Sequence, residues 1–162
     1  YSLGCLLRHS LSPGEFTMLS KEIEALRHYL SIQNYRYSDR LSVDLDIDES
    51  FYNMDIPKLL IQPLVENAIR HGIYRKGRKG GTVSIRTETL EKYNLITIKD
   101  DGVGFDYQKV RDEVERGERD SIGLDNVIFR LKKQLHANIV IKSEIGVGTE
   151  IAVSVPRERK KE

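Results

Sequence analysis

Residues 95–105 read Leu-Ile-Thr-Ile-Lys-Asp-Asp-Gly-Val-Gly-Phe, an apolar stretch that runs directly into a turn with two glycines. The apolar part predicts a strand, with Asp100 at its end. Asp-Asp-Gly is by itself a common turn. The alternative is a ligand site, in which Gly102 and Gly104 let the backbone approach a ligand and Asp100 accepts a hydrogen bond from it. This stretch alone does not decide between the two interpretations.

Three further segments each allow a structural and a functional interpretation. Residues 121–124, Ser-Ile-Gly-Leu, open a predicted helix, whose free N–H groups favour an anion. Asn67 lies near the apolar face of another predicted helix, where its amide needs a partner such as a structural hydrogen bond or a hydrated Mg²⁺. Residues 146–149, Gly-Val-Gly-Thr, suit a hairpin turn, where glycine is common. Each feature is weak alone.

Hydrophobic periodicity predicts an α/β chain. We expect helices over residues 20–37, 58–71 and 124–135. We expect strands over residues 41–47, 82–89, 94–99, 138–142 and 149–155. Two short hairpins argue against an all-parallel sheet, so the predicted fold is a two-layer α/β sandwich. Its five-stranded sheet is mixed and mostly antiparallel, and about three helices cover it.

The ends of these helices carry their own expectations. Pro57 is predicted to open the second helix, and Gly72 to close it as a C-cap. Pro63 lies inside it, so either its first turn is distorted or the helix begins near Gln62. His136 is predicted to cap the third helix. Residues 1–19 are predicted to be the last turns of a helix that begins before the chain.

Composition limits the classes of function. The 162 residues hold 26 Lys and Arg against 25 Asp and Glu, a net charge of +1, which does not suit a nucleic-acid binder. The basic run 75–79 is therefore predicted to be a solvated loop. The single cysteine, Cys5, excludes an internal disulfide and suits a reducing compartment. No apolar run is long enough to span a membrane. Because the chain starts at Tyr1, we expect a piece of a longer protein.

One segment differs from the rest in charge. Nine of the fourteen residues 107–120 are charged, and few are apolar. This composition predicts a solvated and mobile segment. The tail 158–162 is also charged, and we expect it to fray.

The order of these features, rather than any one of them, carries a family resemblance. The chain resembles the GHKL (Bergerat) ATP-binding fold in Asn67, Asp100-x-Gly102-x-Gly104, the charged loop, Gly123-Leu124 and Gly146-x-Gly148-Thr149. The sequence of residues 60–72 is similar to that of LytS/YesM-type sensor histidine kinases. The same similarity extends to Ile32-Gln33, Arg36-Tyr37, Asp39-Arg40-Leu41 and Gly123-Leu124-x-Asn126-Val127. The resemblance covers about residues 6–156.

The resemblance implies roles for individual residues. Asn67 would hold the Mg²⁺ that bridges the ATP phosphates, and with its neighbour Glu66 it forms the candidate catalytic pair. Asp100 would bind the adenine amino group, and residues 105–120 would form a lid over ATP. The remaining cofactor-binding candidates are Arg70, His71, Gly102, Gly104, Phe105, Ser121, Ile122, Gly123, Leu124, Asn126 and Thr149. Ser121 departs from the family, which has glycine there; a positive φ would strain a serine.

The resemblance also implies an organisation and partners. Residues 1–37 would be the end of the dimerisation domain and a connecting helix, 38–157 the catalytic domain and 158–162 a tail. The catalytic domain would pass the γ-phosphoryl group of Mg·ATP to a histidine on the dimerisation domain of a homodimer. A response regulator would be the next partner. No nucleic acid is expected. We expect the cytoplasmic portion of a bacterial inner-membrane protein, attached to the membrane only through a part that precedes this chain.

Two alternatives remain. A GHKL ATPase or ATP-gated clamp of the gyrase or MutL type would place a glutamate four residues before Asn67, where this chain has Pro63, which takes no proton. An interaction module without nucleotide is the third interpretation, and the complete set of polar positions disfavours it. His9 and His28 lie on predicted helices, but neither has the Asn-Pro-His-Phe-x-Phe-Asn context of the family's phosphoacceptor.

Overall fold

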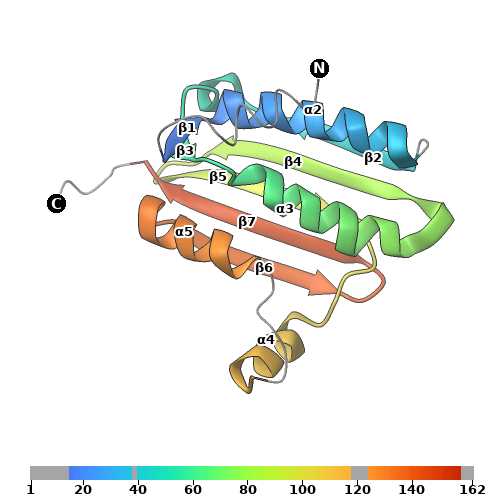
Figure 1. Cartoon of the computed structure of the whole chain (residues 1–162). Coiled ribbons are helices and arrows are strands. Elements are labelled where there is room, and N and C mark those ends of the chain that lie inside the picture. Colours follow the sequence, from blue (N-terminus) through green and yellow to red (C-terminus); the bar gives the residue numbers. More distant parts are fainter. Residues whose placement is uncertain (1–14, 38–39, 118–123, 158–162) are drawn as a thin grey trace.

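The computed structural model describes residues 15–37, 40–117 and 124–157 (Figure 1). Its elements, in chain order, are β1 (Phe16–Met18), α2 (Leu19–Tyr37), β2 (Leu41–Asp46), η1 (Glu49–Phe51), β3 (Asp55–Pro57), α3 (Ile61–Asn67), η2 (Ala68–Ile73), η3 (Tyr74–Lys79), β4 (Gly81–Thr89), β5 (Tyr93–Asp100), α4 (Tyr107–Glu115), α5 (Asp125–Leu135), β6 (Asn138–Glu144) and β7 (Gly148–Pro156). Within these ranges, none of the helices is both long and apolar enough to cross a bilayer.

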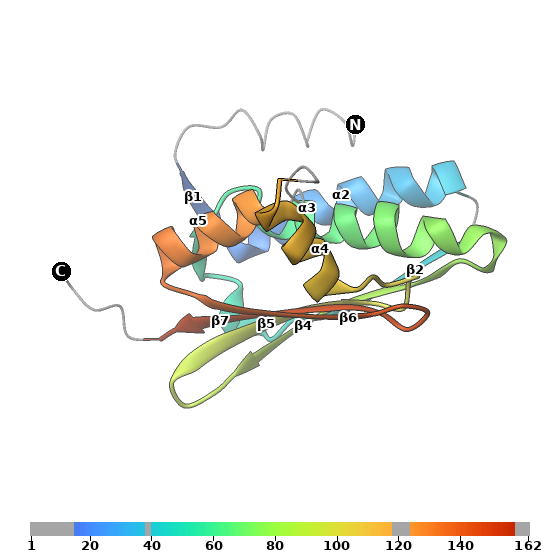
Figure 2. The same cartoon turned by 90° about the horizontal axis from the view of Figure 1, so that it is seen from below.

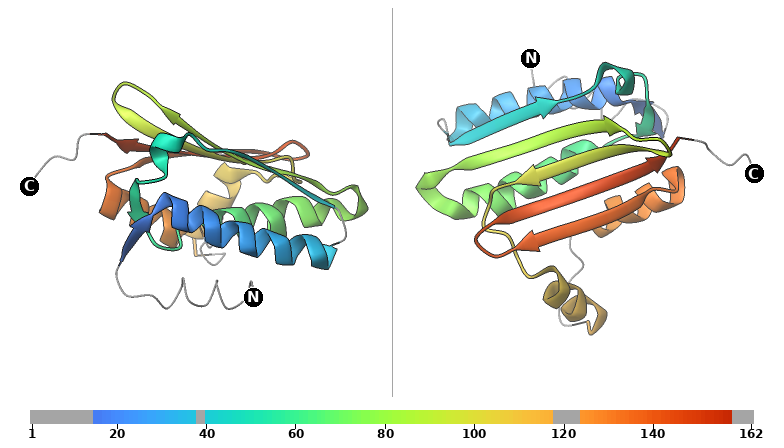
Figure 3. Two further views of the ribbon diagram at one scale, coloured as in Figure 1. Left: turned by 90° about the horizontal axis from the view of Figure 1, so that it is seen from above. Right: turned by 180° about the vertical axis from the view of Figure 1, so that it is seen from behind.

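One five-stranded sheet organises the molecule. Its order is β2-β4-β5-β7-β6, with β2 and β4 parallel and every other neighbouring pair antiparallel. The helices lie on one face of the sheet (Figure 2), and the view from behind shows the other face without them (Figure 3). The predicted two-layer sandwich with a mixed, mostly antiparallel sheet is confirmed, and the expected strands all form.

The core lies between the sheet and the helices because alternate strand residues point toward the helix layer. Ile85, Ile98 and Ile151 form one row across the central strands, and each is buried. On the outer face the next positions are polar, where Lys99 and Glu150 approach to 4.0 Å. The helices pack apolar side chains against this face of the sheet. In α2 the buried ones are Leu19, Ile23, Leu26 and Leu30.

The helix expected over residues 58–71 forms differently. Pro57 does not open it, because Pro57 lies in β3, which pairs with β1. The helix α3 begins at Ile61, so Pro63 lies in the first turn, where its missing N–H is tolerated. After Asn67 the chain continues as the π-helical turn η2, so Gly72 is inside a helical segment and is not the expected C-cap. The close approach of Gly72 to Asp100, described below, accounts for the glycine.

The charged segment also differs from expectation. Its first part is the helix α4, a fourth α-helix within the described ranges, where about three were expected. Asp106 caps it, because its Oδ1 accepts the Lys109 N–H at 2.9 Å, and Val110 packs inward. Residues 118–120 of this segment lie outside the described residues.

The remaining predictions concern residues 15–19, the C-cap of α5 and the chain termini. Residues 15–19, expected as the end of a helix, instead contribute the short strand β1 and the start of α2. His136 is the C-cap of α5 in the left-handed conformation, as predicted. The expectations for residues 1–14 and 158–162 fall outside the described residues.

Candidate functional site

Asp100 lies at the end of β5 and faces the helix layer. The strand register puts it in one row with Val83 on β4, Thr149 on β7 and Ser143 on β6. The neighbouring row across β4, β5, β7 and β6 consists of isoleucines, so the row of Asp100 brings polar side chains next to an apolar part of the inner face. Asp100 itself is only 4% exposed. A buried carboxylate at a sheet end is costly to keep there without a partner, which marks the row as the candidate site.

Three glycines close around Asp100. A Cβ on Gly72 would lie 2.5 Å from Asp100 Oδ1, and one on Gly102 would collide with the backbone of Gly72. A Cβ on Gly148 would collide with the carbonyl oxygen of Asp100. The Val103 N–H donates to the Gly72 carbonyl at 3.2 Å, which ties η2 to the loop after β5. The glycines therefore serve close packing around one residue: Gly72 and Gly102 at the carboxylate of Asp100 and Gly148 at its backbone carbonyl.

The ionisation of Asp100 reflects this burial. Desolvation raises the pKa of Asp100 from 3.8 to about 6, while hydrogen bonds from the backbone of Gly102 and Thr149 act to lower it. The Gly102 N–H donates to Asp100 Oδ1 at 2.8 Å. At neutral pH the side chain is thus still a carboxylate, and it accepts hydrogen bonds only.

Ser143 is a site residue that the sequence analysis did not include. Its Oγ accepts the Phe105 N–H at 2.9 Å, lies 2.9 Å from Thr149 Oγ1 and donates to the Gly148 carbonyl at 3.2 Å. It therefore joins three candidate positions with one hydroxyl. Its signal in the sequence is its place opposite Thr149 across the hairpin that joins β6 to β7.

The loop that leads toward α4 is fixed to the β6–β7 turn. Gly104 has φ +60, and a Cβ there would collide with the Glu144 carbonyl. The Gly146 N–H donates to the Val103 carbonyl at 2.7 Å. The chain is thus held on both sides of Gly104 before it enters α4. The ring of Phe105 meets that of Tyr107 edge-on, with centroids 6.2 Å apart.

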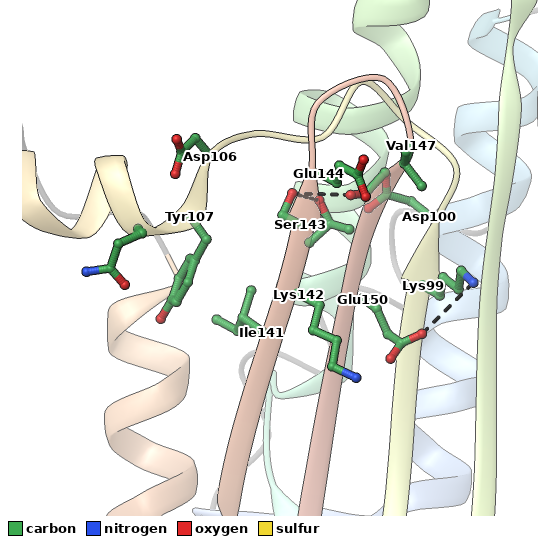
Figure 4. A pocket seen from close by; sticks show the side chains of 13 residues that line it. Lys99, Asp100, Asp106, Tyr107, Ile141, Lys142, Ser143, Glu144, Val147 and Glu150 are labelled. Carbon is green, nitrogen blue, oxygen red and sulfur yellow. Dashed lines mark hydrogen bonds and ion pairs between the residues drawn. The ribbon is translucent and has the colours of Figure 1, made fainter.

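A pocket of about 540 Å³ lies between the start of α4 and the ends of β5, β7 and β6 (Figure 4). Asp100, Ser143 and Thr149 line it from the sheet, and Asp106 and Tyr107 line it from α4. The other lining residues are Lys99, Gln108, Ile141, Lys142, Glu144, Val147, Gly148 and Glu150. The polar row therefore opens toward α4.

The end of α3 holds the second group of candidates. Asn67 and Glu66 are half-buried, and Glu66 accepts a hydrogen bond from Gln62 Nε2 at 2.8 Å. Within the part of the chain that the structure describes, the Asn67 side chain makes no hydrogen bond. Arg70 and His71 follow on η2, and both are exposed. None of these residues lines the pocket of Figure 4.

The candidates at the start of α5 are only partly described. Leu124 is the N-cap of α5 and is buried, whereas Asn126 in the first turn is exposed. Ser121, Ile122 and Gly123 lie outside the described residues. Elsewhere in the described ranges, no group of three or more His, Cys, Asp or Glu side chains gathers to hold a metal ion. A metal ion at this site would have to be held by the Asn67 side chain together with a bound nucleotide.

The architecture is that of solved histidine kinase catalytic domains. The kinase domain of the blue-light activated histidine kinase of Erythrobacter litoralis EL346 has a TM-score of 0.62 and 18% identity, over 96% of this chain and 71% of that chain. The nucleotide-free catalytic domain of ThkA has a TM-score of 0.65 and 13% identity, over 89% of this chain and 99% of that chain. At such low identity these likenesses establish the fold class.

Sequence comparison establishes the family. The chain belongs to the histidine kinase-, DNA gyrase B-, and HSP90-like ATPases, whose family matches residues 54–159, and a histidine kinase family matches residues 1–41. The sensor histidine kinase YpdA of Escherichia coli is 39% identical over 98% of this chain, and YesM of Bacillus subtilis is 34% identical over 96%. The resemblance to LytS/YesM-type kinases is thus confirmed. The chain carries an ATP-binding catalytic domain of this family.

This chain corresponds to a fraction of those relatives. It spans 28% of the length of YpdA and 26% of the length of YesM. The sensor protein LytS of Staphylococcus saprophyticus, 26% identical over 85% of this chain, is spanned over 24% of its length. The family match therefore identifies the domain in this chain. It does not establish the activity of a whole sensor protein.

Proposed function

We propose that this chain binds Mg·ATP at the polar row and the end of α3, and that in a longer protein it donates the γ-phosphoryl group to a histidine of a dimerisation domain. The observation that carries the proposal is the enclosure of Asp100. Its carboxylate is buried, has one oxygen on the Gly102 N–H, and is approached closely by Gly72 and Gly102, while Gly148 packs against the carbonyl of the same residue.

The chemistry of Asp100 fits an adenine base. A carboxylate accepts hydrogen bonds, and the exocyclic amino group of adenine donates them, whereas guanine has a carbonyl oxygen at the same place. Asp100→Asn keeps an acceptor for the Gly102 N–H but can present an amide N–H to the base. We expect its ATP affinity to fall by at least roughly tenfold and its preference for ATP over GTP to disappear, as measured by calorimetry. Full affinity and selectivity in this variant would leave Asp100 a turn residue.

The end of α3 fits the phosphate end of the nucleotide. Asn67 offers an unshared amide oxygen, a ligand that Mg²⁺ accepts, and Arg70 adds positive charge one turn later. When bound, Mg²⁺ would offset the negative charge of the phosphates. Wild type should bind Mg·ATP in the micromolar-to-millimolar range, roughly −4 to −8 kcal/mol. Asn67→Ala should remove the Mg²⁺-dependent part of this affinity and leave the Mg²⁺-independent part intact. Equal losses with and without Mg²⁺ would remove Asn67 from this role.

The remaining candidates have supporting places in the proposal. Ser143 and Thr149 hold the start of the segment that would form the lid, and Gly104 lets that segment pass beneath Glu144. His71 and Asn126 are exposed on the two helices beside the site, where they would face the nucleotide. Ser121, Ile122, Gly123 and Leu124 would face the phosphates from the start of α5.

The partners follow from the same proposal. Residues 1–37 would belong to the end of the dimerisation domain and its connecting helix, 38–157 to the catalytic domain and 158–162 to a tail. The match of residues 1–41 to a histidine kinase family supports this division. ThkA, whose fold this chain shares at a TM-score of 0.63, has been solved in complex with the response regulator protein TrrA. We therefore propose a response regulator as partner, and a membrane-attached sensor whose cytoplasmic portion includes this chain.

A transfer experiment tests the whole proposal. Because this chain has a donor site but no recognised acceptor histidine, incubation with labelled ATP should give little autophosphorylation and only slow hydrolysis. Addition of a dimerisation domain with the acceptor motif should give labelled histidine on that domain. Rapid hydrolysis by this chain alone, at the ~1–100 s⁻¹ of a competent kinase, would contradict the proposal. It would favour an ATPase, with Glu66 as the first residue to replace, because Pro63 takes no proton.

A further inference from the structure

Glu22 on α2 is a buried carboxylate with an unusual set of partners. Its side chain is 1% exposed, although glutamate is rarely buried. Its Oε1 accepts the Leu59 N–H at 2.8 Å, and its Oε2 accepts the N–H groups of Leu60 at 3.0 Å and Ile61 at 3.3 Å. All of these donors are backbone groups just before or at the start of α3.

These bonds cap α3 from another helix. A helix leaves its first N–H groups unpaired, and a Ser, Thr, Asp or Asn at the N-cap normally satisfies some of them. The N-cap of α3 is Leu60, whose side chain makes no cap hydrogen bond. Glu22 supplies the missing acceptor. The neighbouring Leu59 has φ +53, a left-handed conformation that a leucine keeps only when its surroundings hold it.

The same short segment is held by two more elements. The Lys58 N–H donates to the Glu15 carbonyl at 3.0 Å, just before β1. Arg130 of α5 donates from Nη2 to the Lys58 carbonyl at 2.5 Å. Residues 58–61 are therefore the joint at which β1, α2 and α5 meet the start of α3. In the views of Figures 1 and 3, α2 and α3 lie side by side.

Glu22 and its hydrogen-bond partners lie in two different regions of the chain. Glu22 lies within residues 1–41, which match the histidine kinase family, and its partners lie within residues 54–159, which match the ATPase family. It is thus a direct bond between the two matched regions. At the ~1.5 Å rise of a helix, Asn67 lies roughly 9 Å along the axis from Ile61. A short helix transmits a displacement of its first turn over that distance as a nearly rigid body.

We propose that Glu22 is a positioning residue that couples α2 to α3, so that the placement of α2 sets the position of Asn67 relative to the nucleotide. The proposal rests on the proposed function, because it assigns Asn67 to the Mg²⁺-bound phosphates. Asp100 belongs to the sheet, its hydrogen bonds come from Gly102 and Thr149, and the helical segment that continues α3 meets it at Gly72, beyond Asn67. Coupling through Glu22 therefore acts on the metal-dependent part of nucleotide binding and spares recognition of the base.

The test compares Glu22→Gln with a control on the same helix. Glu22→Gln keeps the shape but turns one acceptor into an N–H donor that faces backbone N–H groups. Glu24→Gln removes an exposed carboxylate that pairs only locally with Lys21 at 3.1 Å. Calorimetry measures ADP and ATP binding with and without Mg²⁺ for both variants of this chain, and melting is followed in parallel. Glu22→Asp, which keeps the charge on a shorter side chain, is the rescue variant.

We expect Glu22→Gln to lose affinity roughly tenfold in the presence of Mg²⁺ and to match wild type in its absence. Glu22→Asp should recover part of the Mg²⁺-dependent affinity, and Glu24→Gln should match wild type throughout. Equal behaviour of Glu22→Gln and Glu24→Gln would overturn the proposal, as would equal losses with and without Mg²⁺. If wild type does not bind Mg·ATP, the proposed function fails instead.

A second measurement covers the case in which Glu22→Gln does not fold. By linkage, Mg²⁺ binding in the wild-type nucleotide complex should slow amide hydrogen exchange at Leu60 and Ile61. The exposed turn at residues 91–92, which joins β4 to β5 at the opposite end of β5 from Asp100, provides an internal reference. Unchanged exchange at Leu60 and Ile61 on addition of Mg²⁺ would also overturn the coupling.

Discussion

The end of β5 and the helix α4 are both polar, yet they are built in opposite ways. Asp100 is buried, its hydrogen bonds come from the Gly102 loop and from Thr149 on β7, and close approaches come from Gly72 on η2 and Gly148 on β7. In α4 three hydrogen bonds are exposed and local: Gln108 bonds with Asp112, Arg111 bonds with Glu115, and the Lys109 N–H donates to the cap residue Asp106. Figure 1 shows α4 beyond the edge strand β6.

The difference separates two tasks of one site. Burial in a low-dielectric setting makes each contact of Asp100 strong and sensitive to small displacements, which suits recognition of a base. Local hydrogen bonds on an exposed helix leave α4 weakly tied to the rest of the domain, which suits a segment that closes over a ligand and reopens. Changes near Asp100 should therefore affect the whole domain, whereas changes in α4 should stay local.

The largest effect is expected for Gly148→Ala. Gly148 has φ +129, and an added Cβ would meet the carbonyl oxygen of Asp100, which cannot move without shifting β5. Backbone strain and overpacking together should lower the free energy of unfolding by ~4 kcal/mol, and nucleotide binding should be lost. Chemical denaturation and calorimetry measure the two effects.

Two glycines in open space serve as controls for Gly148→Ala. Gly146 lies in the same turn with φ +84, and Gly117 follows α4 with φ +70; nothing lies within 4 Å of an added Cβ at either position. Both alanine variants carry only the conformational cost, about 1 kcal/mol. If Gly148→Ala cost no more than Gly146→Ala, close packing around Asp100 would not be what fixes this end of the sheet.

The next effect concerns the charge of Asp100. Its pKa is raised from 3.8 to about 6 by burial, so between these values the folded chain binds a proton that the unfolded chain has released. Stability therefore falls as pH rises through this window, by up to about 3 kcal/mol, and it levels off above pH 6. Asp100→Asn lacks this dependence and should be the more stable protein at pH 7.5. A variant that is less stable than wild type at every pH would contradict the assignment.

Nucleotide binding should show the opposite sign. If the carboxylate of Asp100 accepts the adenine amino group, ATP affinity weakens as pH falls through about 6, where Asp100 becomes protonated. The same titration with Asp100→Asn should lack this inflection. Opposite slopes for stability and affinity in one pH range would distinguish a functional carboxylate from a structural one.

The sequence predicted most of the fold because its periodic patterns are strong. Strict alternation in residues 41–47 and apolar runs in the other strands identify the inner face of the sheet without knowledge of the partners. The weak points were local. Residues 16–18 form a strand too short to carry a period, and α4 has only Asp106 as a cap and Val110 and Val114 at helical spacing.

The sequence pointed to individual residues of the candidate site, but not to the contacts between them. Asp100 and Thr149 are register partners on β5 and β7, and the Gly102 N–H donates to Asp100 Oδ1. Gly72 has a helix-ending residue type, so its actual role against Asp100 requires knowledge of how η2 crosses β5. Glu22 lies in the first turn of α2, where an acidic residue suits the dipole. Its partners lie 37 to 39 positions later in the chain, and no local pattern predicts such a pairing.

The smallest effect is expected for Arg111→Ala in α4. Its guanidinium pairs with Glu115 at 2.9 Å, one helical turn away, and both side chains are more than half exposed. Such a pair supports only its own helix and is screened by salt, so the melting temperature of the chain should not change. Amide exchange should become faster in residues 107–115 alone, and added salt should produce the same change in wild type. A lower melting temperature in Arg111→Ala would mean that α4 is part of the cooperative core, and the contrast between α4 and the end of β5 would then be wrong.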